Sequence, residues 1–136
     1  MSRALTEAVA ARIESVTGAN RVVYRGAVPE APAARYLVVR SNVGTDESVD
    51  LGDSQAMRSA TVTVTSVSRN GSGQAAAGEA MWGAEKAHAA LHGWRPTLGR
   101  AAWKPVVIAS QEPTRDGSLP ETVYFAVERW GFQFQP

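Results

Sequence analysis

The segment 72–96 constrains the fold most, because it alone is long and regular enough for a long helix in a chain otherwise rich in strand patterns. Ser72 is the expected N-cap, and Gly93 the expected left-handed C-cap. An alanine-rich stripe at helical spacing predicts a helix that lies close against a sheet. Centred on Ala84, the expected buried residues are Ala77, Ala80, Met81, Ala84, Ala87, His88 and Leu91.

Trp82 lies on the opposite side of this predicted helix. At about 100° per residue it points away from Ala84 and toward the side that carries Glu79 and Lys86. Two interpretations stay open. Either a loop or the neighbouring Lys86 covers the indole, or the indole docks on another protein, since tryptophan is enriched at interfaces.

The remaining patterns predict one more helix and several strands. Leu5, Val9, Ile13 and Val16 give residues 4–17 an amphipathic helical face. The proline-rich stretch 27–34 is expected to be an extended connector. We expect two hairpins, the first joining 35–43 to 56–68 and the second joining 106–111 to the closing strand. The expected strands are 21–25, 35–43, 56–68, 106–111 and 121–135.

The stretch 44–55 is acidic and contains no basic residue. It carries Asp46, Glu47, Asp50 and Asp53. Such a run favours a solvated, mobile loop that orders against a partner. A calcium site is the alternative, since a hard cation prefers acidic oxygens, but the spacing of the acids fits no EF-hand.

The closing strand ends in large aromatic residues: Trp130, Phe132 and Phe134. They are costly to leave in water, so they either complete the core of the chain or dock on a neighbouring molecule. Gly131 between them is expected to mark a bulge or bend.

Composition narrows the class of partner. With 136 residues the chain is expected to be one domain, residues 1–136. Fourteen basic against 13 acidic residues give a formal net charge of +1, which is too balanced for a domain that grips phosphates. The absence of cysteine excludes disulfides and thiolate chemistry. No apolar run of membrane-spanning length and no signal-peptide pattern occur, so we expect a cytoplasmic product with protein partners.

Candidate catalytic residues are few. His88 and His92 lie one helical turn apart with Glu85 close by, a spacing that can hold a metal, but no third ligand pattern accompanies them. Around Trp103, the basic residues Arg95, Arg100 and Lys104 fit a loop rim or a partner contact better than nucleic acid. With no known catalytic motif, the sequence predicts a scaffold, not an enzyme, with no metal and no cofactor.

Several sequence segments together resemble the tail terminator, or tail completion, proteins of long-tailed bacteriophages. They are VPEAPAARYLVV at 28–39, ATVTVTSVS at 60–68, ALHGWRP at 90–96 and VYFAVERWGFQ at 123–133. The resemblance covers nearly the whole length. None of these segments is a catalytic signature, so the resemblance depends on their combination and order.

The resemblance implies an α+β domain, a mostly antiparallel sheet of about five strands with two helices packed on it. It implies a closed ring, expected to be hexameric, that caps the tail tube, ends tube polymerisation and joins the tail to the head connector. Its partners would be itself, the tube protein and the connector protein, without a membrane or specific nucleic-acid binding, though DNA can pass through the ring. It would act at the head-proximal end of the virion tail after assembly in the host cytoplasm.

This resemblance assigns surfaces, not catalytic residues. Trp82 with Lys86, and Trp130, Phe132 and Phe134, would contact the ring or the tube. The four acids of 44–55 would pair with Arg95, Arg100 and Lys104 of the next subunit. Two alternatives remain: another head–tail connector or minor tail protein, and a small ligand-binding or enzymatic domain that uses His88 and His92.

Overall fold

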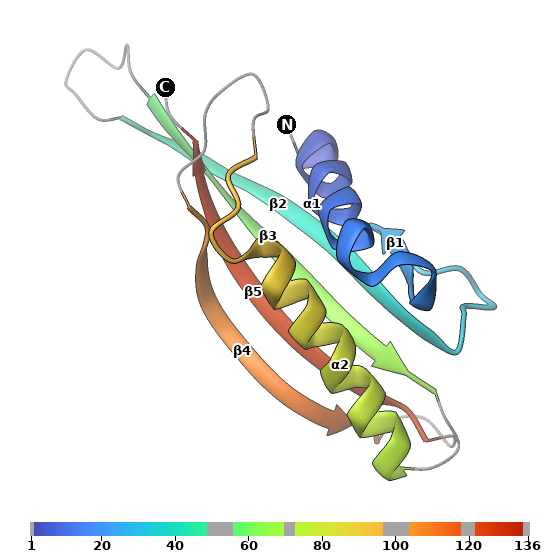
Figure 1. Cartoon of the computed structure of the whole chain (residues 1–136). Coiled ribbons are helices and arrows are strands. Elements are labelled where there is room, and N and C mark those ends of the chain that lie inside the picture. The colour runs from blue at the N-terminus through green and yellow to red at the C-terminus, as the bar shows by residue number, and fades with distance from the viewer. Residues whose placement is uncertain (1, 49–55, 70–72, 97–103, 118–121, 135–136) are drawn as a thin grey trace.

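The computed structural model describes residues 2–48, 56–69, 73–96, 104–117 and 122–134. Within these ranges the chain forms two α-helices and one five-stranded sheet, which confirms the predicted α+β class (Figure 1). In chain order the elements are α1 (Ser2–Thr17), a 3-10 turn (Gly18–Asn20), β1 (Val22–Arg25), β2 (Arg35–Ser48), β3 (Ala56–Ser68), α2 (Gly73–Leu91), β4 (Val106–Arg115) and β5 (Tyr124–Phe134).

The sheet has the strand order β1-β2-β3-β5-β4. β1 runs parallel to β2, and the other three pairings are antiparallel. Both predicted hairpins are therefore confirmed. The short β1 and the longer β4 form the two edges of the sheet, so each edge strand has one side that pairs with no other strand of the described chain.

Two strands continue beyond their predicted ends. β2 continues to Ser48, where Glu47 pairs with Met57, so the loop predicted over 44–55 is wrong for residues 44–48. Residues 49–55 lie outside the described part. β4 likewise continues past Pro113 to Arg115, which an edge strand tolerates because one row of its N–H groups needs no partner.

Of the bulge or bend expected at Gly131, the bulge is absent from β5. β5 pairs with β3 in continuous register through Gly131, and the shifts in register lie in β4. A β-carbon added to Gly131 would lie 3.1 Å from Ile108 Cδ1, so this glycine makes room for the neighbouring side chain.

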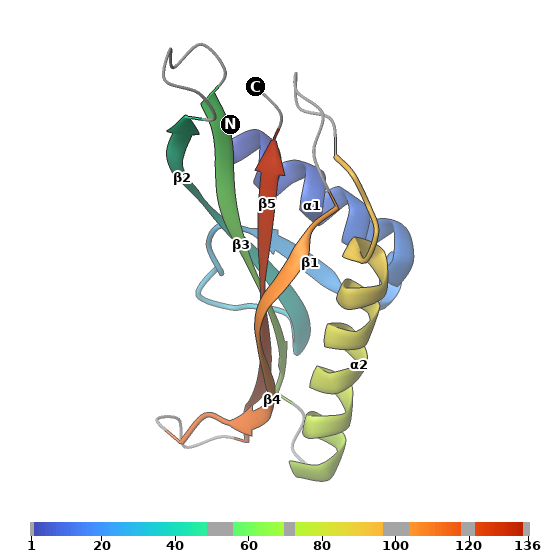
Figure 2. The ribbon, with the colours of Figure 1, turned by 90° about the vertical axis from the view of Figure 1, so that its left-hand side faces the viewer.

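Both helices cover the same face of the sheet (Figure 2). α1 packs against β1 and β2, while α2 packs against β3 and β5. The aromatic end of β5 lies between these layers. Trp130, Phe132 and Phe134 are at most 1 % exposed. They complete the core of this chain, which was one of the two interpretations, and the prediction that they contact the ring or the tube is wrong because their side chains are not on its surface.

The buried face of α2 differs from the predicted one by about one residue. Met81 is 46 % exposed and His88 is also exposed, whereas Gly83 is buried. Gly83 sets this orientation, because a β-carbon there would lie 2.3 Å from Ser66 Oγ of β3. The buried residues of the helix are Ala76, Ala80, Gly83, Ala87, Ala90 and Leu91.

The helix ends agree with the sequence where they are described. Gly18 and Gly93 both have positive φ and follow the last residues of α1 and α2. The expected cap Ser72 lies outside the described residues. In α1, Val16 is 40 % exposed and Thr17 takes its place in the core, donating a hydrogen bond of 3.2 Å to the carbonyl oxygen of Ile13.

The proline connector covers part of the second face of the sheet. Val28 and Ala33 pack on a small cluster that includes Tyr36 and Val67. The backbone N–H of Ala33 donates to the hydroxyl of Tyr24 at 3.0 Å. Neither described helix is long and apolar enough to cross a membrane.

We predict opposite effects of alanine at two glycines of α2. Gly83→Ala should lower the free energy of unfolding by about 1 kcal/mol, since overpacking against Ser66 exceeds the gain in helix propensity. Gly78→Ala is the matched control: nothing lies within 4 Å of the added β-carbon, so it should raise stability by about 1 kcal/mol. Urea unfolding of both variants measures these free energies. A Gly83→Ala protein as stable as the wild type would contradict the close contact with Ser66.

Candidate interaction surface

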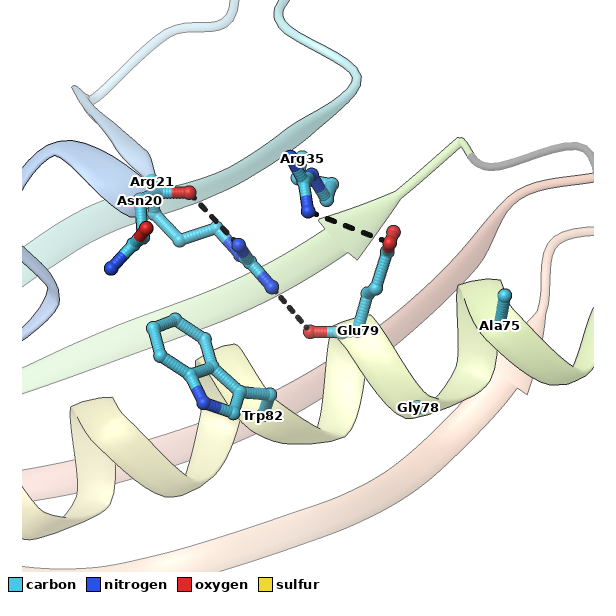
Figure 3. A pocket seen from close by; sticks show the side chains of 7 residues that line it. All are labelled: Asn20, Arg21, Arg35, Ala75, Gly78, Glu79 and Trp82. Atoms are coloured by element: carbon cyan, nitrogen blue, oxygen red, sulfur yellow. Dashed lines mark hydrogen bonds and ion pairs between the residues drawn. The ribbon is translucent and has the colours of Figure 1, made fainter.

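A charged hollow lies between the starts of β1 and β2 and the first half of α2 (Figure 3). Its volume is about 520 Å³. Val22 pairs with Tyr36 in parallel register, so the preceding residues, Arg21 and Arg35, are neighbours at the same end of the two strands. The residues that line the hollow are Asn20, Arg21, Arg35, Ala75, Gly78, Glu79 and Trp82.

Arg21 connects this end of the sheet to α2. Its side chain donates to the carbonyl oxygens of Asn20 at 2.8 Å and Glu79 at 3.3 Å. Its guanidinium carbon lies 4.4 Å from the centre of the Trp82 ring, and Lys86 Nζ lies 5.5 Å from the same ring. The indole is half-buried, and both cations lie against its ring. Lys86 covers it as one interpretation expected; the contribution of Arg21 was not predicted.

Among the residues that the structure describes, Glu79 is the only acid that lines the hollow. Ser68 donates to one carboxylate oxygen at 2.6 Å, and Arg35 Nη1 lies 3.5 Å from the other. The pKa of Arg21 is lowered, first by its burial and second by repulsion from Arg35, while Glu79 opposes the shift. Arg35 contacts the carboxylate of Glu79, whereas Arg21 contacts only its backbone carbonyl oxygen. The described residues that line the hollow thus include two guanidiniums and one carboxylate, an excess of positive charge.

The β4 edge is the second surface feature. Val106 and Ile108 are 67 % and 58 % exposed, respectively. They border a hollow of about 490 Å³ that also includes Lys104 and Gly131. An open strand with apolar side chains and unpaired backbone groups is a template for pairing with another chain.

The predicted histidine pair lies on the exposed side of α2. His88 Nδ1 is 3.0 Å from Glu128 Oε1, and its ring stacks on His92 with centroids 5.8 Å apart. His88 also contacts Trp130, with ring centroids 5.3 Å apart. Within the described ranges, no group of three or more potential ligands could hold a metal ion.

The predicted charged contact residues are only partly placed. Arg95 and Lys104 are exposed. Asp46 and Glu47 occupy the far end of β2, opposite Arg58 and Met57. The other three, Asp50, Asp53 and Arg100, lie outside the described residues.

Sequence reasoning missed the hollow as a unit. Arg21 and Arg35 each stand immediately before an apolar strand run, a signal that was available. The parallel pairing of β1 with β2 brings them together, and this pairing can be known only from the order of the strands in the sheet. Glu79 was noted only as a polar neighbour of Trp82.

We predict that Arg21 and Trp82 are energetically coupled. Replacing Arg21 by Met, Trp82 by Leu, and both together should give a coupling free energy of about 1 kcal/mol, because the pair is largely shielded from water. Denaturant unfolding of the four proteins measures it. As a control, Lys86→Met, whose cation lies farther from the ring, should couple to Trp82→Leu more weakly; additive Arg21 and Trp82 effects would contradict the stacking.

The fold and these surfaces define a small α+β protein whose described features point to contacts with other protein chains. A family model described as "Tail completion protein gp17" matches residues 3–128. The chain therefore belongs to the tail completion protein gp17 family and is a structural protein of a phage-type tail, as the sequence resemblance indicated.

A solved structure supports the fold. The chain is similar to one chain of a structure described as the virion of a native gene transfer agent particle, with a TM-score of 0.69 and 15 % sequence identity. The match covers 97 % of this chain and 95 % of the other. No curated protein sequence matches.

Proposed function

We propose that this protein forms a closed ring, expected to be hexameric, that caps the tail tube, ends its polymerisation and joins the tail to the head connector. Family membership supports a role in the tail. The observation that carries the ring itself is the open apolar edge at β4. The ring would act at the head-proximal end of the tail and would assemble in the host cytoplasm.

A ring needs heterologous contacts, in which one patch fits a different patch on the next copy. The two edges of this sheet differ in this way. β4 is ten residues long with exposed Val106 and Ile108, whereas β1 is four residues long and has α1 packed against it. Copies that joined through β4 to a different surface would repeat in one rotational direction, as a ring requires.

Charge would add to the contact. In this proposal Asp46, Glu47, Asp50 and Asp53 face basic residues of the next copy, among them Arg95, Arg100 and Lys104. The exposure of Arg95 and Lys104 supports their availability. In this proposal Trp82, together with Lys86, also contacts the ring or the tube.

Assembly should depend on salt. Charge pairs at the margin of a contact weaken as the Debye length falls from about 10 Å at 0.1 M to about 3 Å at 1 M salt. We expect the fraction of assembled protein, measured by sedimentation velocity, to fall over this range. Changing all four acids to their amides should remove most of the dependence, and an assembly indifferent to both changes would contradict the charge pairing.

We predict that a charge on the β4 edge prevents assembly. Val106→Lys and Ile108→Lys should each keep the fold, since both residues are exposed, yet reduce the assembled fraction at least roughly tenfold by blocking strand-edge contact. Val16→Lys, on the exposed side of α1, is the matched control and should assemble like the wild type. Size-exclusion chromatography with light scattering measures this; edge variants that assemble normally would exclude β4 from the interface.

A further inference from the structure

We propose that the hollow formed by Arg21, Arg35, Glu79 and Trp82 is a carboxylate-binding site, and that its ligand is the acidic end of β2, at Asp46 and Glu47, of a second copy of this chain. This inference rests on the proposed ring and names one of its contacts. For Asp46 and Glu47, the hollow replaces Arg95, Arg100 and Lys104 as the proposed partner on the next copy.

The charges in the hollow leave capacity for an anion. Glu79 is shared between Ser68 and Arg35. The hydrogen bonds of the Arg21 side chain, within the described part of the chain, go to two backbone carbonyl oxygens and to no carboxylate. Because burial lowers the pKa of Arg21, its charge is held at a cost in free energy that an added carboxylate would offset.

The shape of the hollow also suits such a ligand. The Arg35 side chain is 50 % exposed, so part of its planar guanidinium can be reached from solvent. Gly78 leaves open space where a side chain would stand, and the indole of Trp82 forms a wall beside Arg21 (Figure 3). A guanidinium can bind a carboxylate through two parallel hydrogen bonds, which favours an acidic side chain as ligand.

The acidic ligand has to come from another molecule. Arg35 is the first residue of β2, while Asp46 and Glu47 lie near its last residue, Ser48. At about 3.3 Å per residue, Asp46 and Glu47 lie roughly 36 to 40 Å from Arg35 along the strand. One strand thus carries a basic site at its start and acids at its end, and these ends can meet only between copies. Such head-to-tail complementarity is what a heterologous contact needs.

The hollow is a better-formed receptor than the other basic residues. Arg95 and Lys104 are exposed residues outside the helices and strands. Arg21, by contrast, is 8 % exposed and is fixed by two hydrogen bonds and an aromatic ring. A fixed cation loses less side-chain entropy on binding, so the same acid should bind more tightly here.

A charge exchange tests the contact. Arg35→Glu alone and Glu47→Lys alone should each lower the assembled fraction roughly tenfold, because each places like charges together. The protein with both substitutions should assemble again, since Glu at position 35 would face Lys at position 47 of the next copy. Sedimentation velocity with negative-stain images measures assembly, and thermal melting verifies that each variant is folded.

Matched variants separate the possible outcomes. Arg3→Glu makes the same charge change on an exposed residue of α1 and should assemble like the wild type. If Arg35→Glu is unfolded, Arg35→Gln and Glu47→Gln replace the pair, and their effects on assembly should be non-additive.

Two results would overturn the proposed site: failure of the double variant to assemble, or a loss of assembly with Arg95→Glu and none with Arg35→Glu. Rings that form equally well in all variants would overturn the site and leave the ring intact, whereas a wild type that forms no ring, even with tail tube protein, would overturn the ring itself.

Discussion

At Gly83 the backbone of α2 approaches β3 so closely that a β-carbon would lie 2.3 Å from Ser66 Oγ. The other buried residues on this face of the helix are mostly alanines. Trp130, Phe132 and Phe134 of β5 are at most 1 % exposed and belong to the same core cluster as Ala87, Ala90 and Leu91 of the helix. The small face of α2 and the large end of β5 are therefore two parts of one packing arrangement.

The same close approach positions the charged hollow. With Gly83 against the sheet, Glu79 and Trp82 fall at the margin of the helix that faces the starts of β1 and β2. Arg21 reaches across this margin to the carbonyl oxygen of Glu79 and the ring of Trp82. The excess positive charge thus follows from backbone packing, and it lies where another chain can reach Arg35. The apolar β4 edge lies at the opposite side of the sheet order from β1, so the molecule presents two different surfaces.

Much of the fold could be predicted from local patterns. The spacing of Leu5, Val9 and Ile13, the alternation in 56–68 and the glycine at 93 each report on nearby backbone, and each element formed as expected. The face of α2 was misjudged because alanine and glycine carry little periodic signal and the contact with Ser66 decides the orientation. The end of β2 was predicted to be a loop because its composition is acidic, whereas its pairing with β3 cannot be read from the local sequence. The hollow depends on the parallel neighbours β1 and β2, which no single segment of sequence specifies.

The most direct test of the proposed cap is the growth of tail tubes in its presence. Tube protein from the same particle would be polymerised with increasing amounts of this chain, and tube lengths and ends would be recorded by electron microscopy. The account predicts a ring at one end of each tube and a mean length that falls as the amount of protein rises. Tubes of unchanged length with bare ends would contradict it.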